Sequence, residues 1–421
     1  MTRGRKSKRV LIYSHDSFGL GHLRRCREIA HCLVGADSDI SVLILSGSPI
    51  IGSFDYRARV DFVRIPGVIK LRNGEYTSLN LHIDTEHTLA IRGAIVERTA
   101  QVFDPHLFLV DKEPLGLCGE VRDTLAMLKA RGTACVLGLR DVMDDPALLE
   151  AEWRRKNVLP TLEAYYDEIW VYGLPQIYDP LAGIQLSDSL RKRMTFTGYL
   201  GRHVPEAAPV FVPEKIDGPF LLVTVGGGGD GEEIIDWVLS AYETDPDLPD
   251  PALLVLGPFM GSKHQAEFLH RTNRLANVEA ITFDTHIESL MARAKAVVCM
   301  GGYNTFCEVL SFDKRALIVP RTVPRKEQYI RATRAQELGL ARMLLDDGVR
   351  DPRTMATALR NLPQQALPSD TVVPGLLDGG ANVVKLAGKW LETDRSKFPA
   401  ARGDPDAARD VPRPTAARRA K

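Results

Sequence analysis

The chain has 421 residues, of which 44% are hydrophobic and 26% are charged, and its 54 basic residues balance its 54 acidic residues. This length and apolar fraction predict two or three folded domains and exclude a disordered or fibrous protein. The zero net charge disfavours a nucleic-acid-binding protein, which would carry a strongly basic domain.

Export and membrane insertion are not predicted. No apolar run reaches the roughly 18 residues of a membrane-spanning helix, and the basic start leads into a short run that is too polar for a signal sequence. The six cysteines lack the spacing of metal sites or of a disulfide framework. We therefore expect reduced thiols and a cytoplasmic location.

Short apolar runs alternate with helical patterns in two series, which is typical of parallel α/β domains. The first series is 10–13, 41–45, 61–65, 107–110, 134–139, 168–172 and 194–199. The second is 220–225, 252–256, 279–283, 296–300, 315–319 and 341–345. The expected order is a basic disordered start (1–9), a first doubly wound domain (10–200), a proline-rich linker (201–219), a second such domain (220–393) and a disordered tail (394–421).

Ligands bind beyond the carboxyl ends of strands in such sheets, so the loops after strands are the candidate sites. After the first strand, Gly19 and Gly21 allow a tight turn into a helix. His22 lies near the start of that helix, where the helix dipole favours the neutral imidazole of a general base. Asp111 ends a later strand and is placed to orient this imidazole. The alternatives are a glycine turn with an exposed histidine and an aspartate that caps a helix.

The second domain opens with a strand that is followed by five glycines in six residues, 226–231. The N–H groups of Gly226, Gly227 and Gly228, together with the dipole of the next helix, suit an anion. No Gly-Lys-Ser/Thr follows, which excludes a Walker loop. A flexible turn is the alternative.

The most specific stretch is Met300-Gly301-Gly302-Tyr303-Asn304-Thr305-Phe306-Cys307-Glu308. Thr305 and Glu308 have the spacing of a capping box. The functional alternative puts a diphosphate on the N–H groups of residues 302–305 and ribose hydroxyls on Glu308, and spacing alone does not separate the two. Glu327 and Gln328 start the next helix, either as ordinary first-turn residues or as partners of sugar hydroxyls.

This stretch, followed by Pro320 and by Glu327-Gln328, resembles the donor-binding signature of GT-B nucleotide-sugar glycosyltransferases. The resemblance is to the MurG-like family 28 group and, more distantly, to the plant secondary-product transferases, and the Gly21-His22 turn resembles the acceptor-side loop of both. It implies an α/β fold of two Rossmann-like doubly wound domains that face a cleft. Met300 replaces a phosphate-contacting histidine of the plant enzymes, which the MurG-like members also lack.

The resemblance assigns a role to each candidate residue. It places the donor diphosphate on Gly302, Asn304 and Thr305 in the turn that Gly301 opens, and on the loop of Gly226, Gly227 and Gly228. It places the ribose on Glu308, the nucleobase at Phe283 and Asp284, and the transferred sugar on Glu327 and Gln328. On the acceptor side, next to Gly19 and Gly21, it implies His22 as the catalytic base and Asp111 as its orienting partner.

The expected function is inverting transfer of a hexose or N-acetylhexosamine from a nucleotide diphosphate sugar, with UDP as the expected nucleotide, to a hydroxyl acceptor. No metal, cofactor or nucleic-acid partner is expected. A nucleotide-sugar epimerase of the same fold and a non-catalytic nucleotide-sugar-binding protein are the alternatives. The two basic ends are either solvated tails or peripheral contacts with an anionic membrane.

Overall fold

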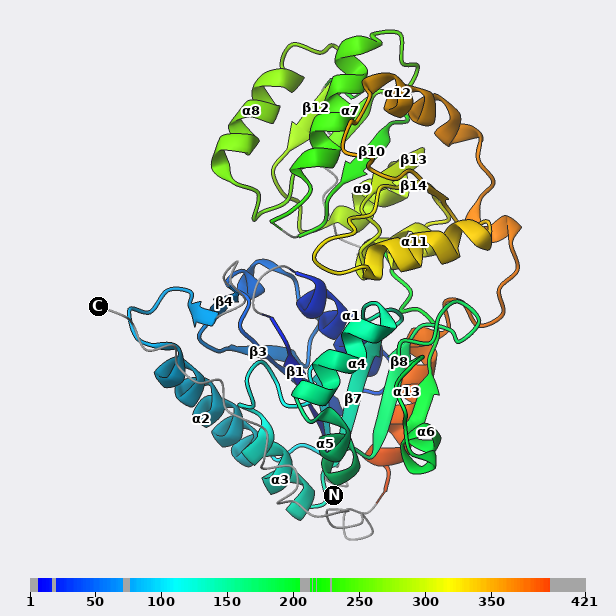
Figure 1. The fold of residues 1–421 in the computed structure, drawn as a ribbon. Helices are drawn as coiled ribbons and strands as arrows, with labels where there is room; N and C mark the ends of the chain where they lie inside the picture. Colours follow the sequence, from blue (N-terminus) through cyan, green and yellow to red (C-terminus); the bar gives the residue numbers. More distant parts are fainter. Residues whose placement is uncertain are drawn as a thin grey trace.

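The computed structural model describes residues 7–16, 20–70, 76–204, 213, 215–216, 218–227 and 229–393. These residues form two parallel sheets, each covered by helices on both faces, one above the other in Figure 1. The predicted α/β fold class is confirmed. Gly19, Gly228, residues 1–6, the tail and most of the expected linker lie outside the described residues.

The first sheet has seven parallel strands in the order β3-β2-β1-β6-β7-β8-β9. They are β1 (Lys8–Ser14), β2 (Ile40–Ser46), β3 (Val60–Arg64), β6 (Leu107–Asp111), β7 (Ala134–Arg140), β8 (Glu168–Tyr172) and β9 (Met194–Phe196). Its helices are α1 (Gly21–Ala36), α2 (Thr85–Phe103), α3 (Arg122–Ala130), α4 (Pro146–Arg155), α5 (Val158–Tyr165) and α6 (Asp188–Arg193), with a short 3-10 turn at Ile51–Ser53. An antiparallel hairpin of β4 (Val68–Lys70) and β5 (Tyr76–Ser78) was not predicted from the sequence.

The second sheet has six parallel strands in the order β12-β11-β10-β13-β14-β15. They are β10 (Leu221–Thr224), β11 (Ala252–Val255), β12 (Val278–Ile281), β13 (Ala296–Cys299), β14 (Arg315–Ile318) and β15 (Arg342–Met343). The helices that follow are α7 (Glu232–Thr244), α8 (Ser262–Thr272), α9 (Ile287–Arg293), α10 (Tyr303–Ser311), α11 (Glu327–Glu337), α12 (Pro352–Asn361) and α13 (Gly379–Leu391), with 3-10 turns at Leu362–Gln364 and Pro368–Asp370.

Every predicted apolar run contains or overlaps a strand, and the strands at the centre of each sheet are buried on both faces. All five residues of β6 and all four of β10 are buried, as helices on both sides of a parallel sheet require. The carboxyl ends of β1 and β6 are neighbours, since Tyr13 is paired with Val110. In the second sheet the ends of β10 and β13 are neighbours, since Thr224 is paired with Cys299.

Two expected boundaries are wrong. The start was expected to be disordered up to residue 9, but Lys8 and Arg9 already belong to β1, which runs beside β2. The second domain was expected to extend to residue 393, but α13 returns to the first domain and packs on α1 (Figure 1). The reason is an apolar face of Val383, Leu386 and Ala387 that is buried there, a contact that no local pattern reveals.

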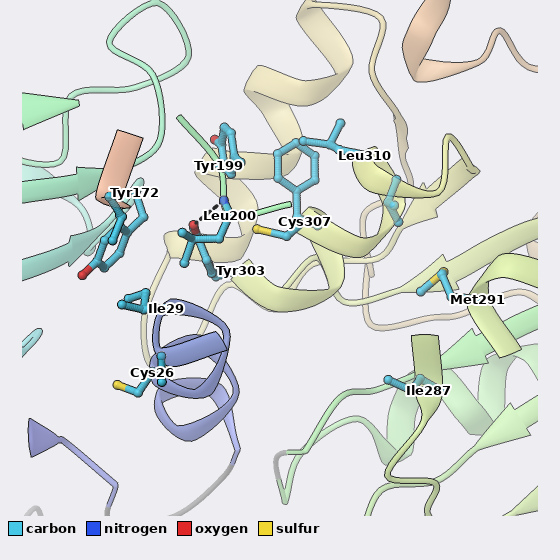
Figure 2. Close-up of a cluster of buried hydrophobic side chains, with 14 of the residues drawn as sticks. Cys26, Ile29, Tyr172, Tyr199, Leu200, Ile287, Met291, Tyr303, Cys307 and Leu310 are labelled. Atoms are coloured by element: carbon cyan, nitrogen blue, oxygen red, sulfur yellow. Dashed lines mark hydrogen bonds between the residues drawn. The ribbon is translucent and has the colours of Figure 1, made fainter. Parts of the chain in front are cut away.

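The chain crosses between the domains through a buried aromatic cluster (Figure 2). Tyr199 stacks on Tyr303 at 6.0 Å and meets Phe306 edge-on at 5.3 Å between ring centroids. The backbone N–H of Leu200 donates to the Tyr303 hydroxyl at 3.5 Å. The two domains therefore share one continuous core where the chain passes from one to the other. Among the described helices, none combines the length and the apolar composition needed to cross a membrane.

Candidate active site

His22, Asp111 and Arg25 form a hydrogen-bonded cluster at the carboxyl ends of β1 and β6. His22 is the second residue of α1, and its Nδ1 lies 2.5 Å from Oδ2 of Asp111, the last residue of β6. Arg25 donates from Nε and Nη2 to the two oxygens of the same carboxylate, at 2.9 and 2.6 Å. Because the carboxylate accepts the Nδ1 proton, Nε2 is left as the basic nitrogen of His22.

The surroundings set the charges of this cluster. Burial lowers the pKa of His22, against the opposing effect of its hydrogen bond to Asp111. Burial opposes ionisation of Asp111, but the charges of Arg25 and His22 outweigh it and hold the pKa of Asp111 well below its usual range. At neutral pH the pair is thus a neutral imidazole on an ionised carboxylate, the state that a general base requires.

The loop before α1 is held by Asp16. Its Oδ2 accepts hydrogen bonds from the hydroxyls of Ser14 and Ser46 at 2.6 and 2.5 Å, and its Oδ1 accepts from the backbone N–H of Leu23 at 3.2 Å. These bonds tie the start of α1 to the ends of β1 and β2. The position of His22 is therefore fixed by the sheet.

The turn before α10 has the backbone that the glycines suggested. Gly301 has φ +74°, and a Cβ there would lie 2.6 Å from Cγ2 of Ile318, so a glycine is required. Gly302 is the N-cap residue of α10 and no side chain caps this helix. The first-turn N–H groups at the positive end of the α10 dipole are therefore suited to an anion.

The capping-box interpretation of Thr305 and Glu308 is wrong. Because α10 begins at Tyr303, Thr305 already lies inside the helix, and both residues are buried. The carboxylate of Glu308 accepts a short hydrogen bond from Nη2 of Arg24 in the first domain, and the same nitrogen lies 2.9 Å from Oε1 of Glu288 on α9. Burial, with Glu288 close by, raises the pKa of Glu308 to about 7 despite the arginine.

Two further donor-side positions contact the first domain. Asn304 donates from Nδ2 to the carbonyl oxygen of Gly21 at 3.0 Å and accepts from Arg202 at 2.8 Å. Gly226 has φ +75°, and a Cβ on Gly227 would lie 2.6 Å from Cγ of Leu20. Both expected phosphate loops therefore lie against the loop and helix that carry His22.

Glu327 and Gln328 begin α11 and are buried. Oε1 of Glu327 accepts from Arg321 at 2.6 Å, and Oε2 has no hydrogen-bond partner among the described residues. Farther along α11, the fully buried Arg331 donates to both oxygens of Asp141 at 2.7 and 2.6 Å and to the carbonyl oxygen of Gly301 at 2.8 Å. Arg331 thus links the donor-side turn to the first domain.

The expected nucleobase position also lies against the first domain. Phe283 meets Phe54 of the first domain edge-on, with ring centroids 6.3 Å apart. Asp284 accepts from the backbone N–H of His286 at 2.7 Å, and the His286 ring lies 2.8 Å from Asp55. An aromatic pair with polar neighbours therefore stands where the resemblance places a base.

Comparisons with known proteins agree with this architecture. Residues 221–370 match the model of the Glycosyltransferase family 28 C-terminal domain. The second domain thus matches a glycosyltransferase family 28 C-terminal domain, and the chain is similar to the MurG-like group of that family. The resemblance drawn from the sequence, and the enzyme class that it implied, are confirmed.

Relatives and solved structures extend the comparison to the whole chain. An uncharacterized glycosyltransferase of Methanosarcina acetivorans is 24% identical over 89% of this chain and 96% of its own length. The UDP-N-acetylglucosamine--N-acetylmuramyl-(pentapeptide) pyrophosphoryl-undecaprenol N-acetylglucosamine transferase of Haemophilus influenzae is 26% identical over 39% of this chain, a match that spans about half (48%) of that relative. The calicheamicin glycosyltransferase CalG4 shares the fold, with a TM-score of 0.60 and 16% identity, over 92% of this chain and 98% of its own.

Several residues of this glycosyltransferase site were not singled out from the sequence. Arg24 and Arg25 follow His22 on α1, Arg331 lies one turn beyond Glu327, and Asp16 follows β1. Asp16 could have been found from the sequence, since an aspartate just after a strand is often structural or functional. The arginines could not, because their partners come from segments that are distant in the chain. Among the described residues, no group of three or more His, Cys, Asp or Glu side chains is arranged to hold a metal ion.

Proposed function

We propose that this glycosyltransferase transfers a hexose or N-acetylhexosamine from a UDP-linked donor to a hydroxyl acceptor, with inversion at the anomeric carbon. The observation that carries the proposal is the His22–Asp111 hydrogen bond, which lies two residues along α1 from Arg24, the residue that binds Glu308 at the donor side. The name of the Haemophilus relative, which specifies UDP-N-acetylglucosamine, supports the choice of nucleotide and sugar.

In the proposed reaction, Nε2 of His22 removes the proton of the acceptor hydroxyl as its oxygen attacks the anomeric carbon. Asp111 stabilises the imidazolium that forms, and Arg25 keeps the carboxylate in place. The glycosidic oxygen of the donor leaves on the diphosphate from the opposite face of the sugar. General base catalysis of this kind is worth about a hundredfold to ten-thousandfold in rate.

The departing diphosphate gains negative charge, which the backbone N–H groups of the turn after Met300 and the start of α10 stabilise in this proposal. The hydroxyl of Thr305 and the loop of Gly226 and Gly227 complete the site. These hydrogen-bond donors support a reaction in which no metal is needed to stabilise the departing diphosphate. Oε2 of Glu327, which has no hydrogen-bond partner within the described part of the chain, supports contact with a sugar hydroxyl, with Gln328 beside it.

The test begins with a thermal-shift screen of nucleotide sugars, since a ligand that binds only the folded protein raises its melting temperature. With a donor found, the His22→Ala variant should bind it as the wild type does and lose sugar transfer by about a hundredfold or more. His264→Ala is the matched control, because the side chain of His264 is half-exposed on α8, and this variant should transfer sugar normally. Full transfer activity in His22→Ala would remove His22 as the base.

The same assays separate the alternatives. If NMR shows that the donor is converted to its epimer in the absence of an acceptor, the protein is an epimerase and not a transferase. Tight donor binding with no reaction across a broad acceptor panel would indicate a non-catalytic binding protein. We also propose a cytoplasmic location, and fractionation of a variant without residues 1–6 and 394–421 tests whether these ends hold the enzyme on a membrane.

A further inference from the structure

Arg321 contacts both of the residues that the proposed function places on the donor sugar. Its backbone N–H donates to Oε1 of Gln328 at 3.1 Å, and its Nη2 donates to Oε1 of Glu327 at 2.6 Å. Glu327 and Gln328 are both buried, so these contacts are shielded from water. One residue therefore determines which side-chain atoms Glu327 and Gln328 have left for a ligand.

The contact with a backbone N–H fixes the orientation of the Gln328 amide. A backbone N–H can only donate, so the amide must turn its oxygen toward Arg321. The amide nitrogen then points away from Arg321, because the two atoms lie on opposite sides of the amide carbon. The group of Gln328 that is left for a ligand is therefore the amide nitrogen, which can only donate.

The carboxylate of Glu327 has the opposite polarity. Its Oε1 is bound to Arg321, and its Oε2 has no hydrogen-bond partner in the described part of the chain. Burial alone would raise the pKa of Glu327, but the charges of Arg140 and Arg321 outweigh it and hold this pKa at about 2. The carboxylate is therefore ionised at neutral pH, and Oε2 can only accept.

Arg321 is itself held at a second point, across the turn that begins α10. It follows β14, and its Nη1 donates to Asp230 in the glycine loop after β10. Because β13 lies between β10 and β14 in the sheet, the guanidinium spans the end of β13. Gly231 lies against Met300 at this end, since a Cβ on Gly231 would lie 3.1 Å from Sδ of Met300. The side chain of Arg321 thus ties the glycine loop to the start of α11.

The start of α11 is also held by residues outside the helix. The backbone N–H of Lys326, the N-cap residue of α11, donates to Oδ1 of Asp144 in the first domain at 3.0 Å. One turn beyond Glu327, Arg331 donates to the carbonyl oxygen of Gly301 at 2.8 Å. These contacts resist the helix rotation that would change which atoms Glu327 and Gln328 present.

We propose that Arg321 is a positioning residue that fixes the hydrogen-bond polarity with which the enzyme recognises the donor sugar. Oε2 of Glu327 accepts a hydrogen bond from one sugar hydroxyl, and Nε2 of Gln328 donates one to an oxygen at a second position of the sugar. The donor is thus a sugar with a free hydroxyl at the first position, and sugars that are deoxygenated or O-substituted there are selected against. The inference rests on the proposed function and deepens it by defining the donor sugar.

The experiment uses calorimetry to measure the affinities of UDP, of UDP-N-acetylglucosamine, and of the 3-, 4- and 6-deoxy and deoxyfluoro analogues of this sugar nucleotide. Fluorine accepts a weak hydrogen bond and donates none, so each pair of analogues reports the polarity at one position. At the position that meets Glu327, both analogues should bind about 10- to 100-fold more weakly than the parent. At the position that meets Gln328, the deoxy analogue should bind about 2- to 10-fold more weakly, and the fluoro analogue should lose less.

Two isosteric variants should reverse these polarities. In Glu327→Gln the amide oxygen accepts from Arg321 and an N–H group faces the sugar, so the fluoro analogue at that position should bind better than the deoxy analogue. In Gln328→Glu a carboxylate oxygen replaces the amide nitrogen, so the advantage of the fluoro analogue at the second position should disappear. Glu337→Gln is the matched control, because Glu337 is exposed at the end of the same helix, and it should bind every analogue as the wild type does.

Arg321→Met tests the positioning role, because it keeps the backbone N–H and removes the guanidinium. The parent sugar nucleotide should bind about 10-fold more weakly or worse, whereas the affinity of the deoxy analogue at the Glu327 position should change little. The preference at the Gln328 position should persist, and Arg321→Lys should restore part of the lost affinity. Equal weakening of the parent, its deoxy analogue and UDP would show a merely structural role and contradict the proposal.

The proposal is overturned if the deoxy and deoxyfluoro analogues lose affinity equally at every position, or if both isosteric variants keep the wild-type pattern. Melting temperatures show whether each variant folds, and if Glu327→Gln does not, the pattern in Gln328→Glu decides. Failure of UDP-N-acetylglucosamine to bind the wild type is seen before any analogue is used, and it would count against the proposed function rather than against the role of Arg321.

Discussion

The catalytic proposal depends at the residue scale on one neutral nitrogen. His22 is 19% exposed, enough for Nε2 to meet a substrate, while Nδ1 is committed to Asp111. Burial favours the uncharged imidazole and Asp111 favours the charged one, and the balance lowers the pKa of His22. A base works when deprotonated, so the rate should hold at pH 6.5 and fall only at lower pH.

Asp111→Asn should lower the maximal rate by about a hundredfold or more, because the imidazolium loses its partner and its ring orientation. It should also move the acid limb of the pH–rate profile to lower pH, since it removes the interaction that raises the pKa of His22 while Arg25 stays nearby. The profile of kcat/KM measures both effects. A limb that moves to higher pH would contradict the proposed role of Asp111.

At the scale of elements, α1 couples the two halves of the site. Three of its residues meet different partners: His22 and Arg25 bind Asp111 of the same domain, and Arg24 binds Glu308 and Glu288 of the other. Arg24 therefore contacts the carboxylate that the resemblance assigns to the donor ribose.

Arg24→Met should destabilise the fold by about 3–5 kcal/mol at alkaline pH, because it leaves two buried carboxylates without their cation. This loss of stability should become smaller as the pH falls, because the pKa of Glu308 in the folded protein lies above its usual value. Protonation of the buried carboxylate then removes the unpaired charge. Urea unfolding at pH 6 and pH 9 measures it. Adding Glu308→Gln should restore part of the stability, and a further loss there would contradict the pairing.

At the scale of the whole molecule, the second crossing of the chain ties the domains together. The backbone N–H of Gly379, the first residue of α13, donates to the carbonyl oxygen of Tyr199 at 3.1 Å, and an isolated bridge pairs Leu200 with Asp378. The chain thus enters the second domain and leaves it at one point. This crossing lies beside the aromatic cluster that contains Tyr199 and Tyr303 (Figure 2).

Gly379→Ala should destabilise the protein by roughly 1–3 kcal/mol or more, because its Cβ would lie 2.4 Å from the carbonyl oxygen of Tyr199. Gly388→Ala in the same helix is the control: its Cβ meets nothing within 4 Å, so the change should stabilise the helix by up to about 1 kcal/mol. Thermal unfolding of the two variants compares them. Equal melting temperatures would show that the crossing tolerates a shift.

The sequence by itself determined the strands, the two sheets and the glycine turns. A strand that is buried on both faces, such as β6, leaves a continuous apolar run in the sequence. A left-handed turn, such as that at Gly301, leaves a glycine. It also placed His22 and Asp111 at strand ends that a parallel sheet brings together. Only the tertiary structure decided that Glu308 pairs with Arg24 and that α13 belongs with the first domain. Those contacts join residues far apart in the chain, and the spacing of residues along one segment carries no information about partners on another.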